Sequence, residues 1–477
     1  MRQNATLAFS IAASVLLGIS VQAAPRIQCP VRLLTQTRGA NGQFLTFDPK
    51  NPANSTDPGC RNPKASNFYQ TCKVQLDPVT GQPSGATENP GIVCRSITCG
   101  DGHVTMADGS DIYVFGFADV TNVPQADIVT RGNPIPIDPD TGQPEFNAFP
   151  LGSANFSAPT FFATAGQQFY LTLTNSGMRE RPDLFDPHTV HYHGFPNAAS
   201  VFDGEPMASL AIGLGESLTY YYNNQFPGTY MWHCHVEASE HMQMGMLGNL
   251  YIKPRQDAVC AAASAPAYCF KPGVTPTTKW AGFAYEDGDG STGYDKTFFL
   301  QEVSFDPAFH HADQTYQKIP FADMDDTYAM LNGRGYPDTV NPAPILNGNG
   351  HPAQPIPAIP MTFDGSGNRV RQVLHTGERV LLRLSSLSTT DFYTVALPGI
   401  PMRLVGQGAQ MLRGPTGINT SYATGSITIG GGEGVDVLLD LTGVAPGTYF
   451  FYSTNLNRLA NDAEDFGGMM TELVVVQ

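Results

Sequence analysis

Evidence for the fold is strongest in one stretch of the sequence, Pro227-Gly-Thr-Tyr-Met-Trp-His-Cys-His235. Its opening phrase returns as Pro446-Gly-Thr-Tyr449, again just before a final β-rich run. A second phrase, a glycine ahead of an alternating strand, is shared by residues 165–173 and 376–384. We interpret this repetition as a duplicated β-sandwich.

The rest of the chain agrees with an all-β fold. Short β-rich runs such as Gln168-Phe-Tyr-Leu-Thr-Leu-Thr174 and Arg379-Val-Leu-Leu-Arg-Leu384 alternate with turn-forming residues. Glycine (49) and proline (38) are abundant and only 14% of the residues are charged, against about 25% in ordinary domains. The composition therefore favours strands joined by turns over helical bundles.

The 477 residues suggest two domains with connecting segments. Arg2, a short apolar run and the small residues before Ala24 are typical of an export signal. No later run approaches the roughly 20 apolar residues of a membrane span, so we expect an exported protein, periplasmic or extracellular, without a membrane span. The expected parts are a signal peptide (1–23), a Cys-bearing extension (24–99), a first sandwich domain (100–255), a linker (256–294) and a second sandwich domain (295–477).

The formal net charge of −16 restricts the kinds of partner that the protein can bind. Phosphate would be repelled overall, which argues against binding nucleic acid or an anionic membrane. A metal ion or another cationic partner is easier to accommodate.

Eight cysteines in an exported chain indicate disulfides. Cys234 is the exception because it lies between two histidines. Cys260 and Cys269 are close enough to close one loop, and the five cysteines between Cys29 and Cys99 would staple the extension with one thiol left over. The pairing among those five stays open.

Two clusters carry the chemistry: His188-Thr-Val-His-Tyr-His193 and the segment from His233-Cys-His235 to His241-Met-Gln-Met-Gly-Met246. Residues two apart on a strand face the same way. His191 and His193 can therefore share a face, as can His233 and His235, while Cys234 faces the opposite side. One strand would therefore contribute side chains to two sites, a thiolate site on one face and an imidazole-lined site on the other.

Two imidazoles, one thiolate and a weak thioether are the ligand set of blue copper. We therefore predict a type 1 copper held by His188, Cys234, His241 and Met246. A zinc site would leave Met246 without a role as a ligand. An ordinary structural role is favoured for the other thioethers, Met207, Met242 and Met244.

With these motifs in view, residues from about 100 to 477 resemble the multicopper oxidase branch of the cupredoxins. Thr229-Tyr-Met-Trp-His-Cys-His235 and His191-Tyr-His-Gly194 are similar to two of its motifs, and Gly434-Val-Asp-Val-Leu-Leu-Asp440 to a phrase of its ligand-free domains. The resemblance implies two cupredoxin-like Greek-key β-sandwiches and copper as cofactor. It also implies a second copper site, of type 2 or trinuclear kind, at His191, His193, His233 and His235.

The sequence departs from the family in two ways. Five residues, rather than the family's usual three, separate His235 from His241. A trinuclear cluster takes four His-x-His pairs in this family, whereas the chain has two, and the second domain reads Phe451-Tyr-Ser-Thr-Asn-Leu456 where another pair would stand. We expect a ligand-free second domain and no four-copper reduction of dioxygen.

Two-domain copper nitrite reductases share the spacing from His188 to His193 and the His before the Cys. In them a neighbouring subunit supplies the last ligand, so this resemblance allows a homo-oligomer, a trimer, with His351 or His375 in that role. Neither lies in a motif, and a structural role is favoured for each.

The leading hypothesis is a copper oxidoreductase. A small molecule, a metal ion or a redox protein would give an electron at an exposed edge of His241, and Cys234 would pass it to His233 or His235. The rivals are a non-enzymatic electron carrier or copper-handling protein with only the type 1 site, and a structural sandwich that binds no copper.

Overall fold

The computed structural model describes most of the chain beyond its amino-terminal part. The export signal, Cys60, Cys72 and His351 lie outside the described residues. In the described part, no helix is long and apolar enough to cross a membrane. The described residues are 27–31, 33, 37–38, 44–45, 84–121, 128, 154–195, 199–274, 278–347, 352–364 and 369–477.

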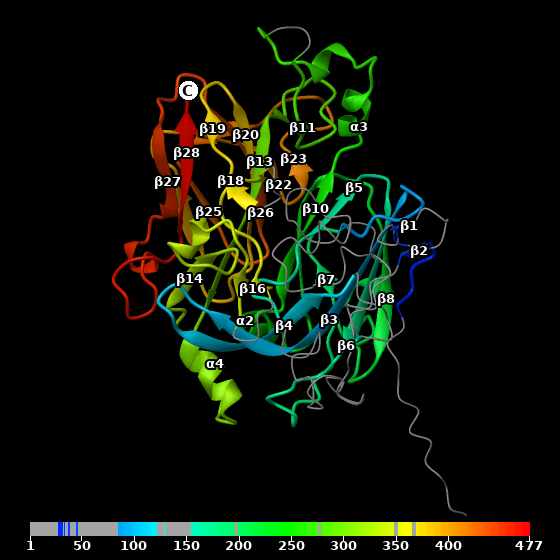
Figure 1. Cartoon of the computed structure of the whole chain (residues 1–477), viewed down its shortest axis with the longest axis vertical. Helices are drawn as coiled ribbons and strands as arrows, with labels where there is room; N and C mark the ends of the chain where they lie inside the picture. The colour runs from blue at the N-terminus through cyan, green and yellow to red at the C-terminus, as the bar shows by residue number, and fades with distance from the viewer. Residues whose placement is uncertain are drawn as a thin grey trace, which may run out of the picture.

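The first sandwich consists of two sheets (Figure 1). Its first sheet has the order β4 (Asp111–Asp119), β3 (Ile92–Thr105), β6 (Gln168–Asn175) and β8 (Ser217–Asn223). Its second sheet has the order β5 (Phe161–Thr164), β10 (Leu247–Lys253), β9 (Gly228–His233) and β7 (His191–Tyr192). Strand β3 begins before the expected domain boundary at residue 100, so part of the predicted extension belongs to the sandwich.

The second sandwich repeats this plan. Its larger sheet has the order β14 (Tyr328–Leu331), β13 (Lys296–Phe305), β20 (Arg379–Ser386), β26 (Gly434–Asp440), β22 (Met402–Gln407) and β23 (Gln410–Met411), with β24 (Tyr422–Thr424) also on β22. The other has the order β19 (Leu374–His375), β28 (Met470–Val476), β27 (Gly447–Ser453), β21 (Tyr393–Ala396) and β25 (Ser426–Ile429). The parallel pairs β3–β6 and β13–β20 correspond, as do β5–β10 and β19–β28. The predicted duplicated, all-β fold is confirmed.

Short elements connect and border the sandwiches. The helices are α2 (Ala238–Gln243), α3 (Gln256–Ala261) and α4 (Pro307–Gln314). The two-stranded ribbons are β1–β2 (Thr37–Arg38 and Phe44–Leu45), β11–β12 (Gly282–Phe283 and Gly293–Tyr294), β15–β16 (Ile345–Leu346 and Pro352–Gln354) and β17–β18 (Met361–Phe363 and Arg369–Arg371).

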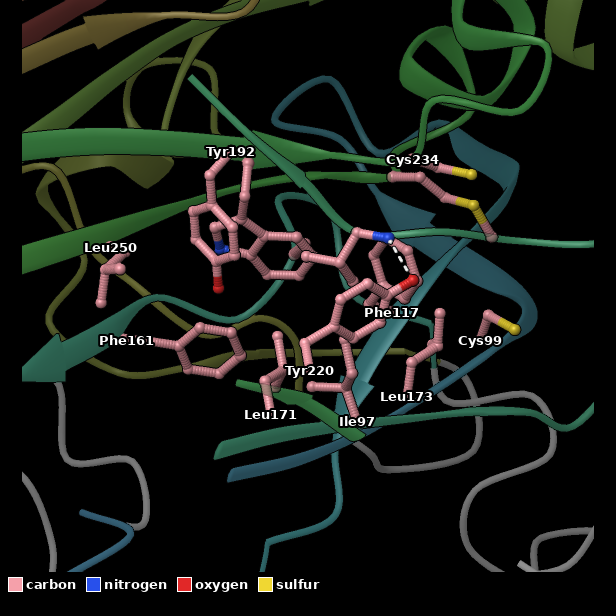
Figure 2. Packing of buried hydrophobic residues seen from close by; sticks show 14 of the residues in the cluster. Ile97, Cys99, Phe117, Phe161, Leu171, Leu173, Tyr192, Tyr220, Cys234 and Leu250 are labelled. Carbon is pink, nitrogen blue, oxygen red and sulfur yellow. Dashed lines mark hydrogen bonds between the residues drawn. The ribbon is translucent and has the colours of Figure 1, made fainter. Parts of the chain in front are cut away.

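An aromatic core fills the first sandwich. The ring of Phe161 stacks on Trp232 with centroids 5.3 Å apart, and the hydroxyl of Tyr220 accepts a hydrogen bond from the backbone N–H of Val190 at 3.1 Å. Figure 2 shows Cys234 toward one end of this packed cluster, away from Phe161 and Leu250. The thiol therefore lies in a dry part of the sandwich.

A buried polar network joins the two domains. Asp436 of β26 accepts hydrogen bonds from the hydroxyl of Thr229 in β9 at 2.6 Å and from the guanidinium of Arg383 in β20 at 3.2 Å. Tyr285 donates to the other carboxylate oxygen, and Ser385 donates to Asn249 at 3.0 Å. The second domain thus holds β9, the strand that leads into the His-Cys-His motif.

Two disulfides are present among the described cysteines. Cys260 pairs with Cys269, as predicted. Cys29 pairs with Cys94, which ties the extension to β3. Cys99 is a buried free thiol, like Cys234.

We expect the substitution Asp436→Ala to destabilise the protein by about 3–5 kcal/mol, because it leaves the Arg383 guanidinium buried without its carboxylate. Denaturant-induced unfolding measures this loss. The double variant Arg383→Leu/Asp436→Leu removes both charges and should lose less stability. A single variant as stable as the parent would contradict the prediction.

Candidate metal centre

The end of β9 separates two sets of ligand side chains. His233, the last residue of the strand, pairs with His191 of β7. The next residue, Cys234, donates its backbone N–H to the carbonyl of Met246 at 3.1 Å. Because side chains alternate along the extended chain, the imidazole of His233 and the thiol of Cys234 point to opposite sides.

The first set gathers around the sulfur of Cys234. The Nδ1 atoms of His241 and His188 lie 3.2 Å and 3.8 Å from Sγ, and the backbone N–H of Thr189 donates to Sγ at 3.4 Å. Met246 is fully buried in the same core. Two imidazoles and one thiolate-forming group therefore converge on one small space, with the predicted thioether residue close in the fold.

The expectation of an exposed His241 edge was wrong. His241 is 0% exposed. The ring of Phe115 packs edge-on against it at a centroid distance of 5.4 Å, and its Nε2 lies 4.0 Å from the carboxylate of Glu237, which is 61% exposed. The motif does not predict burial by aromatic packing, and the exposed group beside this imidazole is the carboxylate of Glu237.

The protonation states of this set suit a cation. Burial lowers the pKa of His241 to about 4 and that of His188 well below its usual range, so both imidazoles are neutral and keep lone pairs. Burial raises the pKa of the Cys234 thiol to about 11. The protein alone does not hold a thiolate here at neutral pH, whereas a bound metal cation would.

The second set consists of imidazoles whose tautomers are fixed by backbone carbonyls. The Nδ1 atoms of His191, His193 and His233 face the carbonyl oxygens of Asp203 at 2.8 Å, Gly432 at 3.3 Å and Cys234 at 2.6 Å. An imidazole that donates from Nδ1 keeps an acceptor lone pair on Nε2. Carbonyl partners of this kind orient metal-binding histidines.

The free nitrogens of this set face one another. Nε2 of His193 and Nε2 of His233 are 2.9 Å apart, and one ligand atom from each of His191, His193 and His233 lies within 4.8 Å of the others. Burial lowers the pKa of His233 to about 3. Facing lone pairs repel unless a cation lies between them, so the donor set fits a metal ion. His235 lies alongside, its ring 4.9 Å from that of His191.

Gly432 brings the second domain onto this set. It has φ +89°, and a Cβ there would lie 2.7 Å from Nδ1 of His193. Only glycine allows the backbone to approach the imidazole this closely. Sequence reasoning missed Gly432, because nothing in the run Gly430-Gly-Gly-Glu433 marks a contact with a distant histidine.

Comparison with known families identifies the chain. Residues 151–257 and 309–472 match two family models, each described as multicopper oxidase, and together they cover more than half of the sequence. The chain belongs to the multicopper oxidase family. Copper is therefore its cofactor, and it is an oxidoreductase.

Solved structures agree with the fold. A blue copper oxidase from Nitrosomonas europaea has 18% sequence identity and a TM-score of 0.51, covering 80% of this chain and 85% of its own. The multicopper oxidase mgLAC has 17% identity and a TM-score of 0.50 with the same coverage. At this identity the likeness shows the fold alone. A search of the curated proteins found no match.

The second domain of this multicopper oxidase has the same strand arrangement around the positions of the first ligand set, but other residues occupy those positions. Ladder register defines the corresponding positions: Tyr230 faces Leu250 as Tyr449 faces Leu473, and β7 pairs with β9 as β21 pairs with β27. The corresponding pairs are Cys234 and Ser453, Met246 and Met469, and His188 and Tyr393. A hydroxyl at the thiolate position and a phenol at an imidazole position leave the described part of this domain without the copper donors predicted for the first.

A buried carboxyl lies in the same core. Glu302 of β13 is fully buried beside its ladder partner Ser386, and neither of its oxygens has a hydrogen-bond partner within the described residues. Burial raises the pKa of this carboxyl well above its usual range, so the folded protein keeps it protonated.

The remaining candidate, His375, lies in a different environment. Its ring is half-exposed and 3.4 Å from the carboxylate of Glu378, which also binds Lys296 at 2.8 Å. These contacts support the structural role that was favoured for it.

We expect Gly432→Ala to remove copper held by the second set and to leave the first set intact, because the new Cβ displaces the imidazole of His193. Copper content and paramagnetic-resonance spectra measure this. Gly443→Ala is a matched control, since Gly443 also has positive φ, +76°, with no atom within 4 Å of an added Cβ. Unchanged copper content in Gly432→Ala would contradict the prediction.

We expect Glu302 to make the stability depend on pH. Its folded pKa is raised, so its contribution is fully present below the unfolded pKa and is lost as pH rises toward the folded value. The slope approaches about 1.4 kcal/mol per pH unit for one proton. Denaturant unfolding across pH should show a flatter profile for Glu302→Gln, and the exposed Glu464→Gln should keep the parent's slope.

Proposed function

We propose that this multicopper oxidase is an exported enzyme with two distinct copper sites in its first domain. The type 1 site is formed by His188, Cys234 and His241 with Met246 as the axial thioether. The second site is formed by His191, His193 and His233, with His235 beside them. The observation that carries the proposal is that the adjacent residues His233 and Cys234, at the end of β9, face opposite sides, and that a set of metal-binding side chains gathers on each side.

The first set supplies a soft, dry environment. Sγ of Cys234 and two Nδ1 atoms converge, all three side chains are buried, and the N–H of Thr189 stabilises negative charge on sulfur. Copper bound there would supply one-electron transfer between its two oxidation states.

The second set supplies a harder, more open environment. His191 and His193 are only partly buried, and their Nε2 atoms are available for a ligand because Nδ1 faces a carbonyl. The peptide bond from His233 to Cys234 links this set to the first covalently, which provides a short path for an electron.

The class of electron donor is proposed from the net charge of the chain and from the burial of His241. The chain carries −16 overall, and the exposed carboxylate of Glu237 lies between solvent and His241. We propose a cationic donor, a metal ion or a basic redox protein, with a small organic molecule as the other class. Each must deliver its electron past this carboxylate rather than by touching the imidazole.

The missing His-x-His pairs limit the chemistry. In the described part of the second domain no metal-ligand cluster is found, and its ligand positions hold a serine and a tyrosine. The proposed enzyme therefore works with two separate sites and not with the four-copper arrangement. An electron carrier with the type 1 site alone is the rival, and it gives the three facing imidazoles no role.

The test is copper stoichiometry with visible and paramagnetic-resonance spectra on the mature protein. We expect two copper ions per chain, one with the intense visible band of a thiolate-bound type 1 site and one with an ordinary spectrum. Cys234→Ser should lose the band and the oxidase activity and keep the ordinary signal. The blue signal alone would support the carrier, and neither signal would overturn both copper assignments.

A further inference from the structure

Two of the proposed type 1 ligands, His241 and Met246, lie on a segment that is too short to fix its own position. Helix α2 has six residues, and its N-cap residue Glu237 has φ 44° and no side-chain capping hydrogen bond. A helix of this length is unstable by itself. His241 lies within it and Met246 follows it, so their positions depend on what α2 packs against.

Gln243, between these two ligands, is anchored by the second domain. It is 0% exposed. Its Nε2 donates to the carboxylate of Asp326 at 2.8 Å and to the hydroxyl of Thr389 at 3.0 Å. Its Oε1 accepts the backbone N–H of Asp306 at 3.0 Å. Both amide hydrogens and the amide oxygen are thus used, and every partner belongs to the second half of the chain.

The backbone of Gln243 is held from the same side. His310 of α4 lies with Nε2 2.9 Å from the carbonyl of Gln243 and Nδ1 2.6 Å from the carbonyl of Tyr113 in β4. Figure 1 shows α4 beside β4, although the two are far apart in the sequence. A single buried imidazole therefore lies between α2 and a strand of the first sandwich, and in its neutral form it donates to one of these two carbonyls.

Asp326, which binds the amide of Gln243, is itself held by further hydrogen bonds. Asp326 also accepts the hydroxyls of Ser304 at 2.5 Å and Thr390 at 2.7 Å through its other oxygen. These residues lie on and beside the large sheet of the second sandwich. A shift of Gln243 would break several buried hydrogen bonds at once, each costly because no water replaces it.

We infer that Gln243 is a positioning residue of the type 1 site, through which the ligand-free second domain sets the place of His241 and Met246. This inference rests on the proposed function. It gives the second domain a task in the reaction although it holds no ligand: the second domain supplies the rigid frame on which a short ligand helix is mounted.

The alternative is that Gln243 contributes only to stability. The two hypotheses predict different effects on copper binding and on the copper spectrum. A positioning residue changes metal affinity and the spectrum of the site, whereas a merely stabilising one changes only the resistance to unfolding.

The experiment compares Gln243→Met with Gln256→Met. Gln256 is a matched control because it is also buried, 4% exposed, and its amide binds the carboxylate of Asp287 at 2.8 Å and the N–H of Gly288 at 2.9 Å. It lies on α3, away from both proposed sites. Methionine keeps the volume of glutamine and removes its hydrogen bonds.

We expect Gln243→Met to bind type 1 copper at least about 10-fold more weakly, as for loss of an orienting partner, with a shifted visible band and a changed copper hyperfine splitting. Gln256→Met should lose stability and keep the parent's spectrum and affinity. If both variants lose stability and both keep the parent's copper affinity and spectrum, the inference is overturned. Where Gln243→Met is insoluble, Asp326→Asn is measured against the same criteria.

A parent protein without any type 1 signal would overturn the proposed function instead, and the two failures are thereby distinguished. The stability of the copper-free parent and variants, measured in parallel, separates a folding defect from a displaced ligand helix.

Discussion

The alternation of side chains at the end of β9 is the constraint on which the arrangement depends. Adjacent residues in an extended chain face opposite ways, so His233 and Cys234 cannot serve the same site. Once both are ligand residues, the sandwich must provide a dry pocket on one side and a more open imidazole cluster on the other. Phe115 closes the first, and Gly432 of the second domain approaches the second.

The second domain contributes to both sides of this strand. Its sheet holds β9 through Asp436 and Arg383, and its residues around Asp326 hold Gln243. These contacts are polar and buried, and such contacts tolerate little displacement. The two sandwiches therefore behave as one rigid support for the residues between them, in contrast to domains joined by a wet, mobile interface.

Much of the fold and of the candidate ligand sets was predictable from sequence. The repeated Pro-Gly-Thr-Tyr phrase predicted the duplication. Period-two spacing put His191 with His193 and His233 with His235, and the family resemblance placed both pairs at one site. The burial of His241 was not predictable, because it comes from Phe115 on another strand. The same holds for Gly432 and Gln243, whose roles arise from contacts with residues at least 63 positions away in the sequence. The partner of Cys29 stayed open since spacing alone does not distinguish Cys94 from its neighbours.

The residues at the corresponding positions of the second domain show that this sandwich plan does not depend on metal ligands. Ser453, Met469 and Tyr393 fill the positions of Cys234, Met246 and His188 within a sandwich of the same plan. The same sandwich plan therefore accommodates either donor side chains or ordinary buried side chains at these positions, because packing and coordination are separable demands on them. In the second sandwich these positions meet only demands of volume and polarity, together with those of the surface that this half offers to the first.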